Sequence, residues 1–215
     1  MKRTIPITTL FLDIGGVLLT DGWDHHARKR AAMTFKLEWA EMEARHRLNF
    51  ATYEEGKLTL EEYLSRTVFH EERPFTRDQF REFMFSQSQP YPEMIDLIAQ
   101  LKLKYQLKIA VVSNEARELN AYRIRKFKLG RSVDCFISSC FVHLRKPDAD
   151  IFRLALDIAQ TPVEQVIFID NTLMFVQIAQ DLGIRSIHHT DYNATRAQLA
   201  SFGLQIDEDA SHETR

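Results

Sequence analysis

The chain has 215 residues, of which 45% are hydrophobic and 27% are charged, as in a globular protein with one domain or a core domain and a smaller insertion. Its formal net charge of −2 at pH 7 gives no overall field that favours nucleic acid or an anionic membrane. Two cysteines, Cys135 and Cys140, are too few for a disulfide framework, so we expect a reducing, cytoplasmic compartment. The apolar run near the N-terminus breaks at Asp13 and predicts neither a signal peptide nor a membrane span.

The first predicted strand, residues 7–12, is an apolar run with little alternation, typical of a strand buried on both faces. The next stretch, residues 24–88, is charged and aromatic, and three amphipathic segments predict helices: EWAEMEARHRLNFATYEEG, TLEEYLSRTVF and TRDQFREFMF. Thr59 begins a T-x-x-E pattern that predicts a capping box. We therefore expect a helical insertion over residues 20–88.

After the insertion, helical and apolar runs alternate. Helices are expected at residues 92–104, 148–159 and 172–182, with Pro147 in the first turn of the second and Gly183 ending the third. Strands are expected at residues 107–112, 135–138, 166–169 and 184–187. This alternation predicts an α/β core with a parallel sheet and right-handed crossovers, made of residues 1–19 and 89–208. The tail 209–215 is polar and expected to fray.

The basic run at residues 123–131 is interpreted as a solvated helix face. No aromatic platform or known module accompanies it to indicate nucleic-acid binding.

Polar side chains stand where three of the predicted core strands end: Asp13, Ser113 and Asp170. Ligands of open parallel sheets bind beyond the carboxyl ends of the strands, so these side chains should converge on one crevice. Lys146, next to a predicted helix start, can reach the same crevice. One carboxylate can attack phosphorus, the hydroxyl and ammonium can hold phosphoryl oxygens, and the second carboxylate can help to hold Mg²⁺.

Four motifs, in order LFLDIGGVL, IAVVSN, LRKPDADIF and VIFIDN, resemble the four motifs of the haloacid dehalogenase superfamily over nearly the whole chain. The resemblance implies a three-layer Rossmann-like core with a parallel sheet, and a small helical cap where residues 20–88 lie. The first motif resembles a D-x-G-[GN]-V subgroup, some of whose members are similar to sugar-phosphate phosphatases.

The resemblance also implies roles for individual residues. The catalytic residues would be Asp13 as the nucleophile, Ser113 and Lys146. Phosphate would be bound by Ser113, Asn114, Lys146 and the backbone amide of Gly16. Mg²⁺ would be held by Asp13, the carbonyl oxygen of Gly15, Asp170 and Asn171.

The sequence departs from the family pattern at two of these positions. Gly15 stands where the family's phosphatases have an acid that protonates the leaving oxygen, and such help is typically worth ~10²–10⁴-fold in rate. Asn171 stands where many members have a further acid, which removes one negative charge from the metal site. Candidates for recognising the substrate are Asp21, Trp23, Glu55 and His143.

These observations predict a Mg²⁺-dependent phosphatase of a small phosphate ester, such as a sugar phosphate, without nucleic-acid or membrane partners. Two alternatives stay open. One is 2-haloacid dehalogenation, in which the same aspartate attacks carbon without a metal, although those relatives usually carry D-x-Y-G-T. The other is a degenerate fold that serves as a binding or regulatory module.

Overall fold

The computed structural model describes residues 5–206. Over these residues five parallel strands form one sheet in the order β3-β2-β1-β4-β5. Their bounds are β1 Thr9–Leu12, β2 Lys108–Ser113, β3 Cys135–Ser138, β4 Val166–Asp170 and β5 Arg185–His188. The predicted α/β class with a parallel sheet is confirmed, and the first strand lies at the centre of the sheet.

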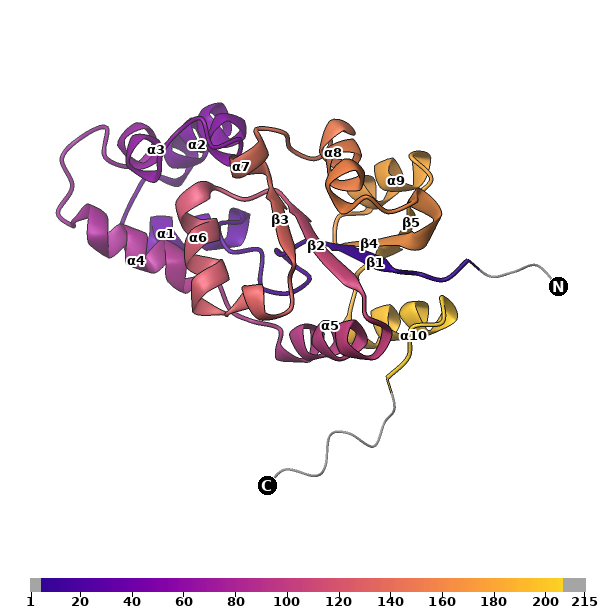
Figure 1. Ribbon diagram of the computed structural model, residues 1–215. Helices are drawn as coiled ribbons and strands as arrows, with labels where there is room; N and C mark the ends of the chain where they lie inside the picture. Colours follow the sequence, from indigo (N-terminus) through magenta and orange to yellow (C-terminus); the bar gives the residue numbers. More distant parts are fainter. Residues whose placement is uncertain (1–4, 207–215) are drawn as a thin grey trace, which may run out of the picture.

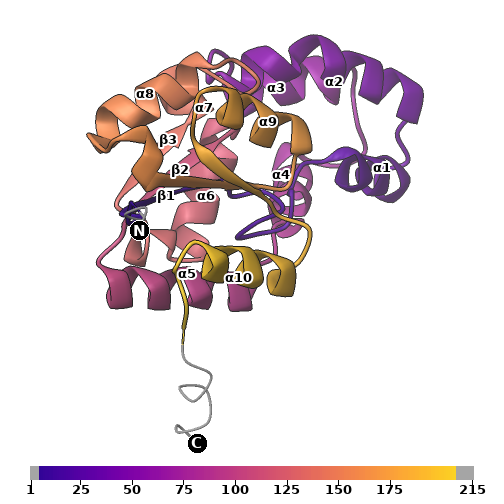
Figure 2. The same cartoon turned by 90° about the vertical axis from the view of Figure 1, so that its right-hand side faces the viewer.

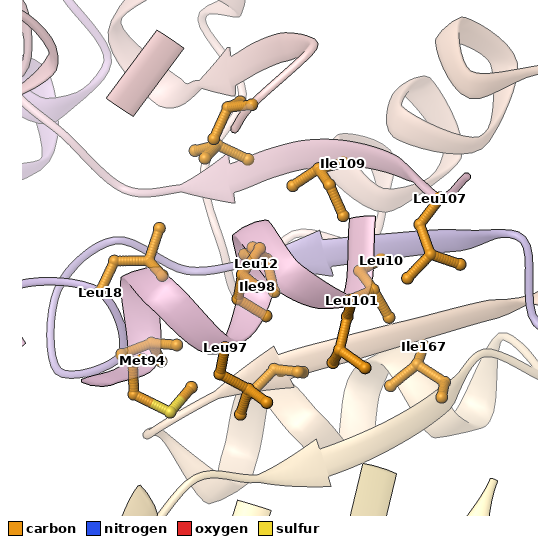
Figure 3. Packing of buried hydrophobic residues seen from close by; sticks show 14 of the residues in the cluster. Leu10, Leu12, Leu18, Met94, Leu97, Ile98, Leu101, Leu107, Ile109 and Ile167 are labelled. Carbon is orange, nitrogen blue, oxygen red and sulfur yellow. The ribbon is translucent and has the colours of Figure 1, made fainter. Parts of the chain in front are cut away.

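Helices cover both faces of the sheet (Figures 1 and 2). One face carries α5 (Pro92–Tyr105) and α10 (Tyr192–Ser201), and the other carries α8 (Asp150–Ala159) and α9 (Leu173–Asp181). Figure 3 shows the first interface, where α5 lays a row of apolar side chains against the central strands: Met94, Leu97, Ile98 and Leu101 against Leu10, Leu12 and Ile109. Because the sheet is buried on both faces, its strands are apolar without alternation.

Four helices lie between β1 and α5 in the sequence: α1 His25–Thr34, α2 Trp39–Glu54, α3 Leu60–Thr67 and α4 Arg77–Ser86. We call them the helical segment; it lies to one side of the sheet (Figure 1). The segment has its own apolar core around Tyr63 and Phe80, to which α6 (Arg117–Lys126) contributes Leu119. The capping box at Thr59 is confirmed, and α1 is a helix that the sequence patterns did not indicate.

Most predicted elements are confirmed with small shifts of their ends. The second and fourth strands extend by one residue, to include Ser113 and Asp170. The prediction for Pro147 is wrong, because α8 begins only at Asp150. The Asp148 backbone N–H instead donates to the carbonyl of Arg145 at 2.9 Å, and its carboxylate accepts from the Asp150 N–H at 2.9 Å, so these residues form a turn before the helix.

The basic run at 123–131 is only partly the solvated face that we expected. Arg125 and Lys126 are exposed, but Arg123 is almost fully buried and pairs with the buried Glu115. The expected frayed tail, 209–215, lies outside the described residues. Among residues 5–206, no helix has both the length and the apolar character needed to cross a membrane.

Candidate active site

The polar strand ends meet around one ammonium group. Asp13 directly follows β1, and Asp170 ends the neighbouring strand β4. Lys146 Nζ lies 3.2 Å from Asp13 Oδ1 and 2.5 Å from Asp170 Oδ2. Lys146 is fully buried, and so is Asp170. The structure therefore brings together the two carboxylates and the lysine that the sequence placed at one crevice.

The charges of these three groups do not balance. Burial alone would lower the pKa of Lys146, but the Asp13 and Asp170 carboxylates outweigh burial and raise it, so the lysine is a cation at neutral pH. Burial, together with the Asp13 carboxylate, raises the pKa of Asp170 to about 6. With both aspartates ionised, the centre carries one more negative charge than Lys146 neutralises. A further cation at this place is thus electrostatically favourable.

The two adjacent glycines after Asp13 have different structural roles. Gly16 has φ +70°, and a Cβ there would lie 1.9 Å from Asn171 Nδ2, so neither the backbone nor the space admits a side chain. Gly15 is outside the left-handed region, and a Cβ there would meet its nearest atoms at ordinary distances, Asp21 Cα and Oδ1 at 3.4 Å. The Asp21 carboxylate thus stands beside the place where the side chain of residue 15 would begin.

Three predicted phosphate ligands already have partners. Ser113 Oγ accepts a long hydrogen bond from the Ile14 amide, at 3.4 Å, which leaves its own proton available. The Gly16 amide donates to the carbonyl of Leu19 at 2.7 Å. Asn114 exchanges two hydrogen bonds with the backbone of Lys146, both at 2.8 Å. Asn114 therefore positions the lysine, and direct contact of Asn114 or Gly16 with phosphate stays a prediction.

A cavity of about 330 Å³ opens above Asp13 and Gly15. Its other lining residues come from the helical segment, from the loop before it and from the core: among them Asp21, Trp23, Phe50, Tyr53, Glu54, Arg145 and Phe175. Trp23 donates its indole N–H to Tyr63 Oη at 2.9 Å, so it is fixed as part of the wall. The volume suits a small molecule.

The acid at the end of α2 that lines the cavity is Glu54, and no sequence pattern distinguished it from Glu55. Glu55, the predicted residue, pairs with Lys57 at 2.7 Å and is not part of the lining. His143 is also outside it and shares a hydrogen bond with the backbone carbonyl of Glu55. The rotation of α2 about its own axis decides which of the two acids faces the cavity, and the sequence alone did not determine that rotation.

The oxygen atoms around Asp13 suit a hard cation better than a transition metal. Within residues 5–206, no three His, Cys, Asp or Glu side chains are grouped to hold a metal ion. The oxygen donors predicted from the sequence are Asp13, Asp170, the amide oxygen of Asn171 and the carbonyl oxygen of Gly15, of which Asp13, Gly15 and Asn171 line the cavity. Mg²⁺ commonly binds through one or two carboxylates and keeps several waters, so this donor set fits Mg²⁺.

Comparison with known proteins gives a family match over most of the chain. A family model described as haloacid dehalogenase-like hydrolase matches residues 7–183. Among curated proteins, drimenol cyclase drtB of Aspergillus calidoustus is 38% identical over 68 residues, which make up 32% of this chain and 13% of that protein. This chain therefore matches only a small part of that relative.

Solved structures share the fold. A HAD family enzyme of Bacteroides thetaiotaomicron is 22% identical with a TM-score of 0.73, over 85% of this chain and 93% of that chain. The same enzyme in complex with magnesium and inorganic phosphate has a TM-score of 0.70 at 22% identity, over 84% and 93%. L-2-haloacid dehalogenase of Xanthobacter autotrophicus is 17% identical with a TM-score of 0.60, over 93% and 85%. At these identities the likeness concerns the fold alone.

Proposed function

Because the chain belongs to the haloacid dehalogenase-like hydrolases, we propose that it is a Mg²⁺-dependent phosphatase of a small phosphate ester, such as a sugar phosphate. The observation that carries this proposal is the buried Lys146 ammonium, held between Asp170 and Asp13, the carboxylate that lines the cavity. A cation fixed beside a nucleophilic carboxylate stabilises the oxygens of a phosphoryl group during transfer.

Asp13 is the proposed nucleophile. Its Oδ1 is held by Lys146 at 3.2 Å, which leaves Oδ2 to attack phosphorus. The P–O bond to the alcohol breaks as the bond to Oδ2 forms, and Asp13 becomes an aspartyl phosphate. Water then attacks the phosphorus, the P–Oδ2 bond breaks, and inorganic phosphate leaves. Ser113 and Lys146 hold the phosphoryl oxygens through both steps.

Mg²⁺ would be held by Asp13, Asp170, the carbonyl oxygen of Gly15 and Asn171. When bound, it supplies positive charge that offsets the negative charge of the phosphoryl group. The complex of a structural relative with magnesium and inorganic phosphate is consistent with this cofactor.

The helical segment is the proposed cap over this core. It contributes Phe50, Tyr53 and Glu54 to the cavity wall, so a substrate bound at Asp13 would lie beneath it. A cap of this kind excludes water and large substrates from the reacting atoms. We place its boundaries at residues 20 and 88, within the two connections that join the segment to the core.

Phosphate release from a panel of small esters tests the function, with Mg²⁺ and with EDTA. We expect hydrolysis that requires Mg²⁺ and that Asp13→Asn abolishes. Asp157→Asn is the matched control, because Asp157 is exposed on α8, away from the cavity. Hydrolysis that survives Asp13→Asn would refute the assignment of Asp13 as the nucleophile. Halide release from 2-haloacids in EDTA would favour a dehalogenase instead, and specific ligand binding without turnover would favour a binding module.

A further inference from the structure

We propose that the Glu54 carboxyl group is the proton donor to the leaving oxygen, in place of the acid that residue 15 lacks. This inference rests on the phosphatase function proposed above. It assigns the acid to the helical segment, whereas the nucleophile stands on the sheet.

Glu54 is the last residue of α2, and it lines the same cavity as Asp13 and Gly15. Arg145 Nε and Nη2 both donate to one carboxylate oxygen, Oε2, at 3.2 and 2.7 Å. Oε1 accepts no hydrogen bond from residues 5–206, and the Glu54 side chain is 15% exposed. One oxygen is therefore anchored, and the other remains free to carry a proton to a ligand.

The end of α2 is fixed to the core, so Glu54 has a defined position. Ser139 Oγ donates to the Glu54 carbonyl at 2.7 Å, and His143 Nδ1 shares a 2.6 Å hydrogen bond with the Glu55 carbonyl. Gly56 has φ +67°, and a Cβ there would lie 2.3 Å from the carbonyl oxygen of Cys140. Only glycine permits this close approach of the two backbones. Cys140 lies on the segment of chain that leads to Arg145 and Lys146.

The surroundings of Glu54 also suit an acid that works near neutral pH. Burial raises its pKa to about 7; the Glu115 carboxylate contributes in the same direction, and Arg145 and Lys146 oppose it. A group with a pKa near the working pH is present in both protonation states, as a general acid and base must be.

Asp21 is the other carboxylate near residue 15. Its Oδ1 lies 3.4 Å from the position of a Cβ at Gly15, but Asn171 Nδ2 donates to that same oxygen at 3.2 Å. That oxygen is therefore already occupied, although burial raises the pKa of the Asp21 carboxyl as well. Glu54 Oε1 has no such donor. Asp21 therefore serves as the comparison residue in the test.

The proton balance closes over both steps. In the first, Asp13 Oδ2 bonds to phosphorus, the P–O bond to the alcohol breaks, and the alkoxide takes the proton from Glu54. In the second, the Glu54 carboxylate takes a proton from the attacking water, and the P–Oδ2 bond breaks. Glu54 and Asp13 are both restored, and the products are the alcohol and inorganic phosphate.

The experiment compares two leaving groups in Glu54→Gln. An alkyl phosphate such as glycerol phosphate needs its leaving oxygen protonated, whereas 4-nitrophenyl phosphate does not. We compare kcat/KM, which covers the steps up to release of the alcohol and excludes the water step that both esters share. We expect kcat/KM for the alkyl ester to fall ~10²–10⁴-fold and kcat/KM for the aryl ester to change by less than about tenfold. The base limb of the alkyl-ester pH profile should also disappear. Glu82→Gln, exposed on α4, is the control and should leave both activities unchanged.

A second variant guards against a merely structural effect. Gly15→Asp in the Glu54→Gln background restores an acid at a position whose φ and space admit a side chain, and we expect it to recover alkyl-ester activity. If Glu54→Gln does not accumulate as folded protein, Glu54→Ala, which also removes the carboxyl group, makes the same comparison. Equal losses of kcat/KM on both esters, or no loss of kcat/KM on either, would overturn the proposal. A selective alkyl-ester loss in Asp21→Asn but not in Glu54→Gln would overturn it too. Loss of all activity in Asp13→Asn bears on the phosphatase function, separately from these outcomes.

Discussion

Replacement of Arg123 by methionine should destabilise the protein strongly. The guanidinium of Arg123 donates to Glu115 Oε1 at 2.5 Å, to Ser88 Oγ at 3.0 Å and to the Thr20 carbonyl at 2.7 Å. Thr20 and Ser88 stand on the two connections between the helical segment and the core. A Cβ at Gly22 would lie 2.0 Å from Arg123 Nη2, so the chain passes close over the guanidinium.

The expected loss of stability follows from the burial of the Arg123–Glu115 ion pair. The side chains of Arg123 and Glu115 are 1% and 3% exposed, and loss of one partner of such a pair costs about 3–5 kcal/mol, because a buried charge remains unpaired. For a chain of this length that corresponds to a melting temperature lower by about 6–20 °C. Burial raises the pKa of Glu115, and Arg123 opposes this rise. Without Arg123 the pKa rises further, so the loss should grow as the pH increases above the carboxyl's ordinary value of 4.5.

Urea unfolding at pH 5 and pH 8 measures both effects. We expect Arg123→Met to be less destabilised at pH 5 than at pH 8. The double variant Arg123→Met/Glu115→Gln should be more stable at pH 8 than the single variant. Arg125→Met is the matched control, because Arg125 lies exposed on the same helix. A loss below about 1 kcal/mol, or a double variant less stable than the single one, would contradict the argument from the unpaired charge.

Three further predictions concern the site and the helical segment. Lys146→Met leaves two carboxylates without their shared cation, and we expect a loss of about 3–5 kcal/mol in urea unfolding, together with loss of phosphate release. Gly15→Ala should leave stability within about 0.5 kcal/mol, whereas Gly16→Ala should cost at least 1–2 kcal/mol by the same assay, since its φ is positive and Asn171 fills the space. Burial lowers the pKa of His46 from 6.5 to about 4, so stability should fall by up to about 3 kcal/mol as the pH drops from 6.5 to 4, and His46→Gln should flatten that part of the profile.

The sequence predicted the site where residue type and strand position agree. Asp13, Ser113 and Asp170 each follow or end an apolar run, and parallel strands present their carboxyl ends at one edge, so their convergence needed no knowledge of packing. Which side chain faces the cavity at the end of α2 could not be predicted in this way. Glu54 and Glu55 are adjacent acids, and contacts of the neighbouring backbone with Ser139 and His143, far along the chain, fix which one faces the cavity.

Arg123 shows a second kind of information that the sequence does not carry. It lies in a run with five basic residues in nine, a composition that indicates a solvated surface. Its burial depends on Glu115 from the loop after β2 and on two residues that flank the helical segment. A buried ion pair between such distant positions follows from the tertiary arrangement, and no local pattern distinguishes its arginine from exposed neighbours.

The two glycines after Asp13 differ in that the fold requires glycine at residue 16 but not at residue 15. Gly16 is required by its turn, because its φ is positive and Asn171 fills the adjacent space. Gly15 has neither constraint, so the backbone would accept the acid that the family resemblance leads us to expect there. The absence of an acid at residue 15 is therefore not a by-product of the turn. If Glu54 supplies the proton, the acid stands on the segment that covers the cavity, and protonation of the leaving oxygen depends on how that segment sits over the substrate. Only a substrate that fits beneath the helices would then be protonated efficiently, and the missing side chain at residue 15 would increase selectivity at the expense of turnover on esters bound without the segment in place.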